Sequence, residues 1–195
     1  MRIGIEINGV LRDTLKKIQE VYQKWYIDNP FLENEDFERK VISDVTSLDI
    51  MSHLSFRDAD ELYNFLYKEY TMEIFGHAGS VEMNSMILLN DFYLDMRDNH
   101  DIWVVSDEMS KSKPASLFFL SKFGCLVENV KFYSEVSLNL MWEQVGVLIT
   151  ADPNLLQDYP DGKTLIKFKT SYNSEIHVKH EITSIKELKA KIESL

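Results

Sequence analysis

Apolar and polar positions along the chain follow two periods, one typical of strands and one typical of helices. The segment RIGIEI (residues 2–7) alternates and stops before Gly9, which predicts a first strand that ends in a tight turn. Residues 14–27 carry apolar side chains at helical spacing, and Asn29-Pro30 predicts the end of that helix. Further short apolar runs predict strands at DIWVVS, VKFYSE, VGVLIT and TLIKF.

Helical patterns fill the intervals between these strands. Ser80 is expected to cap one helix, and the next is expected to contain Pro114 in its first turn and to end at Gly124. Ser184 and Glu187 form a capping box that predicts the start of a last helix. Strands that alternate with helices predict an α/β fold, a Rossmann-like three-layer core with a parallel sheet.

The segment between the first two strands is mostly helical in pattern, with Asp58 or Asp60 near the start of its clearest helix. We therefore predict a small helical cap, residues 15–75, inserted after the first strand of a core formed by residues 1–14 and 76–195. Its aromatic residues are either core or partner-facing residues, which helical spacing favours, or the lining of a pocket for a base: Trp25, Tyr26, Tyr63, Phe65, Tyr67 and Tyr70.

Composition narrows the classes of partner. The chain has 195 residues, of which 45% are hydrophobic, so a sizeable core can be buried and disorder is not expected. The net charge of −11 argues against a nucleic acid polymer as the main partner, because phosphate contacts need clustered Lys and Arg. It leaves open a mononucleotide or a basic protein surface.

The single cysteine and the lack of long apolar runs predict a cytoplasmic protein. Cys125 cannot form an internal disulfide, which favours a reducing compartment, and its apolar neighbours favour a packing role. The first residues do not form a signal peptide, and the longest apolar stretch is too short to span a bilayer, so no membrane partner is expected. The acidic, aromatic-rich composition would also suit a virus-encoded protein.

Several motifs follow the predicted strands, where ligands of parallel sheets bind. IEINGVLRDT resembles the first motif of the haloacid dehalogenase-like superfamily, Asp-x-Asp-Gly-Val/Thr-Leu-x-Asp. IWVVS resembles the second motif, with Ser106 as the phosphate-binding residue, and VGVLITADPN resembles the fourth. The helical insertion resembles the small cap of the 5'(3')-deoxyribonucleotidase branch. The match to the first motif keeps Gly9, Val10, Leu11, Asp13 and Thr14. The motifs together cover nearly the whole chain and occur in the right order.

The resemblance implies a phosphatase mechanism whose groups can be checked one by one. In active members the first aspartate attacks phosphorus, and the second protonates the leaving oxygen and then helps to activate water. A serine or threonine and a lysine hold the phosphoryl oxygens. Mg²⁺ bridges the nucleophile, a backbone carbonyl and an aspartate of the fourth motif.

Most of these positions are altered. Glu6 stands at the nucleophile position and is one methylene longer, and a displacement of about 1 Å can cost on the order of 100-fold in rate. Asn8 stands at the acid/base position, and an amide cannot deliver a proton, which forfeits roughly 10²–10⁴ in rate. Thr150-Ala151 replaces the metal-binding pair. Asp152 follows one residue late, either as a weak metal ligand with Glu6 or as the cap of a turn or helix.

The groups that would hold phosphate each have two interpretations. Ser106 is either a phosphate ligand or an ordinary residue at the end of a strand. Val136 stands where family spacing expects the lysine, and Lys111 or Lys113 could substitute for it or remain solvated. His177 and His180 lack further ligands at metal spacing, so a zinc site is not expected.

These observations leave three hypotheses. The first, which we favour, is a catalytically impaired relative that acts as a binding, structural or interaction subunit, with a protein partner or self-association and no cofactor. The second is a Mg²⁺-dependent phosphatase of nucleoside monophosphates that uses Glu6, Ser106 and Asp152. The third is a sensor that binds a nucleotide or phosphate without turnover.

Overall fold

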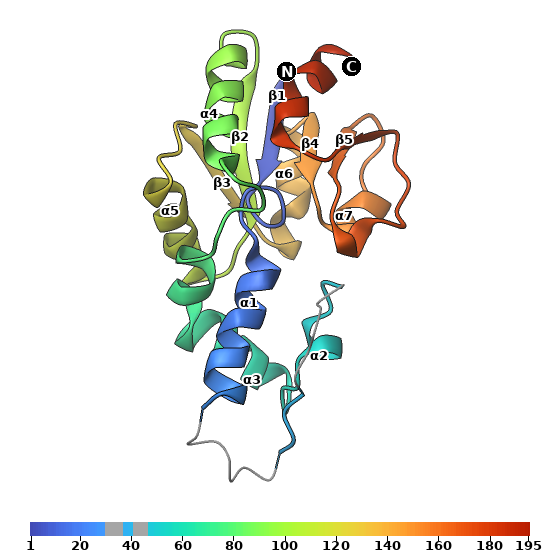
Figure 1. Cartoon of the computed structure of the whole chain (residues 1–195). Coiled ribbons are helices and arrows are strands. Elements are labelled where there is room, and N and C mark those ends of the chain that lie inside the picture. Colours follow the sequence, from blue (N-terminus) through green and yellow to red (C-terminus); the bar gives the residue numbers. More distant parts are fainter. Residues whose placement is uncertain (30–36, 41–46) are drawn as a thin grey trace.

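The core of the molecule is one parallel sheet of six strands. The computed structural model describes residues 1–29, 37–40 and 47–195. The strands lie in the order β3-β2-β1-β4-β5-β6, and each adjacent pair is parallel (Figure 1). Their bounds are Arg2–Glu6 (β1), Asp101–Asp107 (β2), Asn129–Tyr133 (β3), Val147–Thr150 (β4), Thr164–Phe168 (β5) and His180–Ile182 (β6). The predicted α/β class with a parallel sheet is confirmed.

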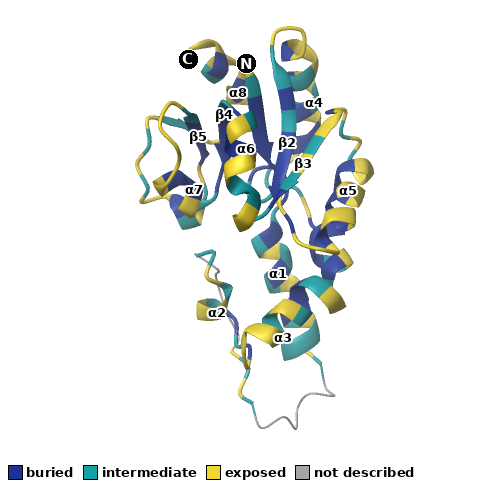
Figure 2. Ribbon diagram, turned by 180° about the vertical axis from the view of Figure 1, so that it is seen from behind, coloured by how far each residue is buried: buried dark blue, intermediate teal, exposed yellow. Residues whose placement is uncertain are grey.

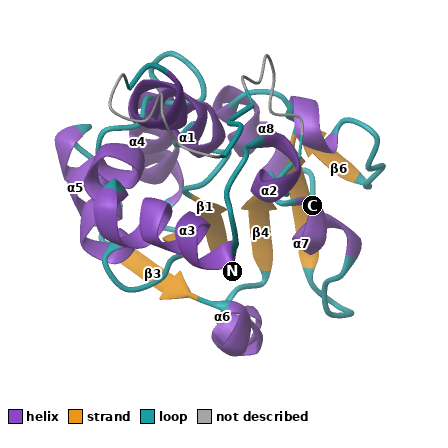
Figure 3. Ribbon diagram, turned by 90° about the horizontal axis from the view of Figure 1, so that it is seen from below, coloured by secondary structure: helices purple, strands orange, loops and turns teal. Residues whose placement is uncertain are grey.

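Helices cover both faces of the sheet and complete three layers (Figure 3). On one face, α4 (Ser85–Met96), α5 (Ser112–Lys122) and α8 (Leu188–Glu193) pack against apolar side chains of β1, β2 and β4. On the other face, α6 (Leu138–Gln144) and α7 (Pro153–Gln157) pack in a second apolar cluster. Both faces of the central strands are therefore buried, as Figure 2 shows, which explains their nearly continuous apolar sequences.

A helical segment extends from the carboxyl-terminal edge of the sheet, and we call it the helical segment below. It comprises α1 (Thr14–Tyr22), α2 (Ile50–His53), α3 (Ala59–Asn64) and the π-helical turns η1 (Gln23–Ile27), η3 (Phe65–Glu69) and η4 (Met72–Gly76). Its buried side chains form a third apolar cluster, rich in stacked and edge-on rings. Most of the aromatic residues discussed above belong to this cluster or pack against it, and Tyr67 also borders a cavity.

Local signals predicted most element boundaries, with two corrections. Asp58 caps α3 and Ser184 with Glu187 forms the expected capping box, whereas α4 begins at Ser85 rather than near Ser80. Ser80 instead pairs with Arg12 in an isolated antiparallel bridge, and residues 81–84 form bends and a turn before the helix begins. The first predicted helix is α-helical only to Tyr22 and continues as a π-helical turn.

Two strands in the carboxyl-terminal half of the chain are short, and the sequence pattern did not predict their bounds. The strand predicted at VKFYSE stops at Tyr133, and residues Glu135–Ser137 form a 3₁₀ turn, η5. Strand β6 is only three residues long, too short to leave a clear pattern in the sequence.

Among the described residues, no helix combines the length and the apolar character needed to cross a lipid bilayer.

Candidate functional site

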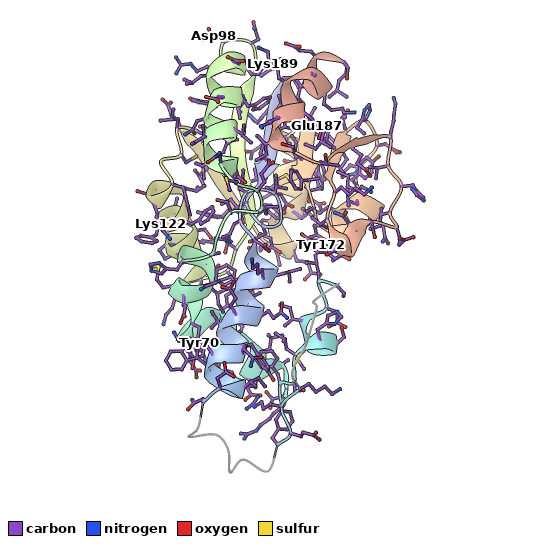
Figure 4. All side chains as sticks on the ribbon, viewed as in Figure 1. Tyr70, Asp98, Lys122, Tyr172, Glu187 and Lys189 are labelled. Atoms are coloured by element: carbon purple, nitrogen blue, oxygen red, sulfur yellow. The ribbon has the colours of Figure 1, made fainter. Side chains whose placement is uncertain are left out.

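A cavity of about 260 Å³ lies between the carboxyl ends of the central strands and the helical segment. Figure 4 places Tyr172, one of its lining residues, at the edge of the core that faces that segment. The described lining residues from the core side are Glu6, Asn8, Gly9, Asp107, Asp152 and Tyr172. Those from the other side are Thr14, Leu15, Ile18, Leu48, Ile50, Leu66, Tyr67 and Phe75.

Gly9 shapes the core side of this cavity. Its backbone has a φ of +74°, which side chains rarely adopt, and a Cβ atom there would lie 2.2 Å from the Tyr172 hydroxyl. The glycine therefore allows the chain to turn after β1 and allows Tyr172 to approach the turn.

Glu6 ends β1 with its carboxyl group almost entirely buried. The hydroxyl groups of Tyr133 and Thr150 each donate a hydrogen bond to one of its oxygens. Burial is the main cause that raises the Glu6 pKa to about 8, and the negative charge of Asp152 adds to it. The two hydroxyl donors favour the charged form, but burial outweighs them. The raised pKa favours the protonated form over a wider pH range than in an ordinary glutamate, and a protonated carboxyl is a poor nucleophile.

Asn8 is held by side chains of its own loop. Its amide oxygen accepts hydrogen bonds from the Arg12 guanidinium at 2.6 Å and from the Thr14 hydroxyl at 2.7 Å. Its amide nitrogen donates to the Ser106 hydroxyl at 3.2 Å. The side chain lines the cavity, but its hydrogen-bonding groups are largely engaged within the protein.

Arg12 is the centre of this buried polar cluster, and sequence reasoning did not identify it. Its guanidinium pairs with Glu108 at 2.7 Å, and both side chains are 0% exposed. It also donates to the Phe75 carbonyl oxygen at 2.8 Å and to the Ser116 hydroxyl at 2.6 Å. Arg12 occupies a variable position of the motif, so the only available signal was a lone arginine between apolar and polar residues.

Ser106 lies at the end of β2 next to Asn8, so the structure brings these two predicted residues together. The serine side chain is fully buried, and its hydroxyl donates to Glu108 at 3.0 Å. It is not among the described residues that line the cavity. A ligand in the cavity would therefore meet Asn8 before it meets Ser106.

The predicted lysines lie elsewhere. Lys111 and Lys113 are both exposed near the start of α5, and neither lines the cavity. Val136, at the position where family spacing expects a lysine, is 95% exposed. Within the described part of the chain, the cavity has no Lys or Arg side chain on its lining. Nothing cationic therefore faces a phosphoryl group from the described walls.

Asp152 lines the cavity and also caps α7, because its carboxylate accepts a hydrogen bond from the Asn154 backbone N–H at 2.8 Å. Burial raises its pKa, and burial together with the charges of Glu108 and Asp152 raises the pKa of Asp107 to about 6. Across the described residues, no three His, Cys, Asp or Glu side chains are grouped to hold a metal ion. Mg²⁺ prefers ionised carboxylates, and the raised pKa of Glu6 disfavours that form.

The remaining sequence candidates lie outside the cavity. His177 is exposed and His180 lies in the edge strand β6, and neither lines the cavity. Cys125 is half-buried, and burial raises the pKa of its thiol, which reduces its reactivity.

Comparisons with known proteins support the fold. No protein-family model matches the chain, and no curated protein matches it. A solved structure from Burkholderia xenovorans LB400, provisionally assigned as a haloacid dehalogenase-like hydrolase, superimposes with a TM-score of 0.55 and 13% sequence identity. The match covers 95% of this chain and 93% of that chain. At this identity the likeness is one of architecture, and the chain has a haloacid dehalogenase-like fold.

Proposed function

We propose that the chain is a catalytically impaired relative of the haloacid dehalogenase-like phosphatases that acts by binding, as a structural or interaction subunit. The observation that carries this proposal is the environment of Glu6. A nucleophile must be ionised and free to approach phosphorus, whereas this carboxyl group is buried and its two oxygens accept hydrogen bonds from Tyr133 and Thr150.

The other catalytic roles support the same proposal. Asn8 cannot protonate a leaving group, and its amide oxygen is occupied by Arg12 and Thr14. The described cavity lining carries Asp107 and Asp152 but no Lys or Arg, so a phosphate dianion would meet like charge. Loss of the nucleophile, the acid and the phosphate-binding cation together accounts for an inactive site better than any single change.

Turnover assays test this proposal directly. The purified chain, incubated with a panel of nucleoside monophosphates and Mg²⁺, is expected to release phosphate no faster than Glu6→Ala. Hydrolysis that is abolished by Glu6→Ala would instead support the Mg²⁺-dependent phosphatase. Nucleotide binding without turnover would support a sensor.

Restoring the motif should restore a metal site. The triple variant Glu6→Asp, Asn8→Asp, Thr150→Asp is expected to bind Mg²⁺ at least tenfold more tightly than the natural chain, about 1.4 kcal/mol, because it adds ionisable oxygen ligands. Isothermal titration calorimetry measures the affinity, and circular dichroism confirms that the variant is folded. Asp161→Asn, an exposed site away from the cavity lining, serves as a control. A folded triple variant with unchanged affinity would contradict the assignment of these positions to the motif.

A further inference from the structure

The cavity beside Glu6 is divided into a polar half and an apolar half. We propose that it binds a small organic cation, an amine whose ammonium group faces Asp107 and Asp152 and whose apolar body packs against the helical segment. This inference rests on the proposed binding function and names the class of ligand. It concerns the whole cavity, in which the carboxylates form only one wall.

Shape and apolar lining provide the first argument. A volume of about 260 Å³ suits a small molecule rather than a peptide. The described side chains contributed by the helical segment are aliphatic or aromatic apart from Thr14: Leu15, Ile18, Ile50, Leu66, Tyr67 and Phe75. Leu48, which lies just before α2, adds to the same apolar wall. The Tyr67 and Phe75 rings lie stacked with centroids 5.8 Å apart. A bound hydrocarbon or aromatic group would bury against this wall.

Charge complementarity provides the second argument. Asp107 and Asp152 both line the cavity and form no ion pair with any described residue, and the charge of Asp152 contributes to raising the pKa of Asp107. Asp107 remains exposed to solvent while it lines the cavity, so an incoming cation can reach it. An ammonium group would supply the missing opposite charge and up to three hydrogen-bond donors.

Other small ligands fit the lining less well. A phosphate monoester would place its negative charge next to two aspartates, and no described Lys or Arg of the lining would balance it. A bare metal ion would make no use of the apolar wall, and the described residues lack a grouped set of metal ligands. An uncharged molecule would use the wall but would leave the aspartates uncompensated. An amine with an apolar body uses both halves.

The test compares ligands that differ in charge and share a body. The probes are 2-phenylethylamine and n-hexylamine, with 2-phenylethanol as the neutral analogue and phenyl phosphate as the anion. Isothermal titration calorimetry at pH 7 is expected to show saturable amine binding at millimolar or lower concentration. The alcohol is expected to bind at least tenfold more weakly than the amine, and phenyl phosphate is expected not to bind.

Variants then locate the binding. Asp107→Asn with Asp152→Asn is expected to weaken amine binding at least tenfold and to leave the weak alcohol binding unchanged. Asparagine is also a good helix cap, so α7 keeps its first turn in this variant. Asp161→Asn, the same change at an exposed position away from the cavity lining, should leave all the affinities unchanged.

Each outcome decides between the claims. Absence of amine binding by the folded protein, equal binding of amine and alcohol, or full binding by the double variant overturns the inference. The same sample is assayed for release of phosphate from nucleoside monophosphates. Turnover there defeats the proposed function, whereas failure of amine binding without turnover defeats only this inference.

Discussion

Arg12→Met is expected to lower the free energy of unfolding by about 3–5 kcal/mol, because it leaves Glu108 charged and buried without its partner. The two side chains are 0% exposed and 2.7 Å apart, so the charge that remains on Glu108 is not screened by bulk solvent. One Glu108 oxygen, Oε2, already has no hydrogen-bond partner in the structure. Equilibrium unfolding in urea at pH 7 measures the change.

The chain contains a matched control for this experiment. Arg2 pairs with Asp101 at the same distance, 2.7 Å, but the two side chains are 35% and 41% exposed. Arg2→Met should therefore cost no more than about 1 kcal/mol. Pairing Arg12→Met with Glu108→Met should recover part of the loss, because no buried charge then remains unpaired. Equal effects of Arg12→Met and Arg2→Met would contradict a stabilising role that depends on burial.

The position of Arg12 explains why a large effect is expected. Its guanidinium donates to the Phe75 carbonyl oxygen in η4 and to Ser116 in α5, so it joins the base of the helical segment to the core. Backbone hydrogen bonds from Asp13 to Gly79 and from Val81 to Leu11 pair the two connecting stretches of chain beside it. Loss of the guanidinium would loosen the wall of the cavity as well as the core.

Much of the fold was readable from local sequence because the signals are local. The turn at Gly9 needs a residue that tolerates positive φ, and Pro114 lies in the first turn of α5, ahead of Gly124 at its end. Asp152 before Pro153 predicts a helix cap, and it caps α7. Each of these assignments depends on neighbours within a few positions, and the apolar runs of the central strands report their burial on both faces.

The contacts of the site could not be read in the same way. Tyr133 reaches Glu6 across 127 positions, and Arg12 reaches Glu108 across 96 positions. No local pattern states that a tyrosine at the end of β3 will donate to a carboxyl at the end of β1. The π-helical turns of the helical segment also escaped a search for the 3.6-residue period, because their wider turns shift the apolar face. The sequence therefore predicted which residues end the strands, and the structure shows which distant side chains hold them.

The protonated state of Glu6 makes the protein less stable as the pH rises. Its pKa lies near 8 in the folded chain and near 4.5 when the group is unperturbed. Below pH 4.5 both states hold the proton, and the contribution of Glu6 to stability is fully present. Between pH 4.5 and 8 the unfolded chain releases the proton while the folded chain retains it. The free energy of unfolding therefore falls across this window, by on the order of 5 kcal/mol in total.

Glu6→Gln is expected to remove most of this dependence, because the amide has nearly the same shape and no charge at any pH in the window. Urea unfolding at pH 5.5 and pH 8 should show a large difference in unfolding free energy for the natural chain and a much smaller one for the variant. Glu128→Gln, at an exposed site, should keep the natural difference. Asp107 and Asp152 are present in all three proteins, so the contrast isolates Glu6. If Glu6→Gln retained the full difference, Glu6 would be ionised in the folded chain at neutral pH. That result would support a carboxylate that binds Mg²⁺ or attacks phosphorus.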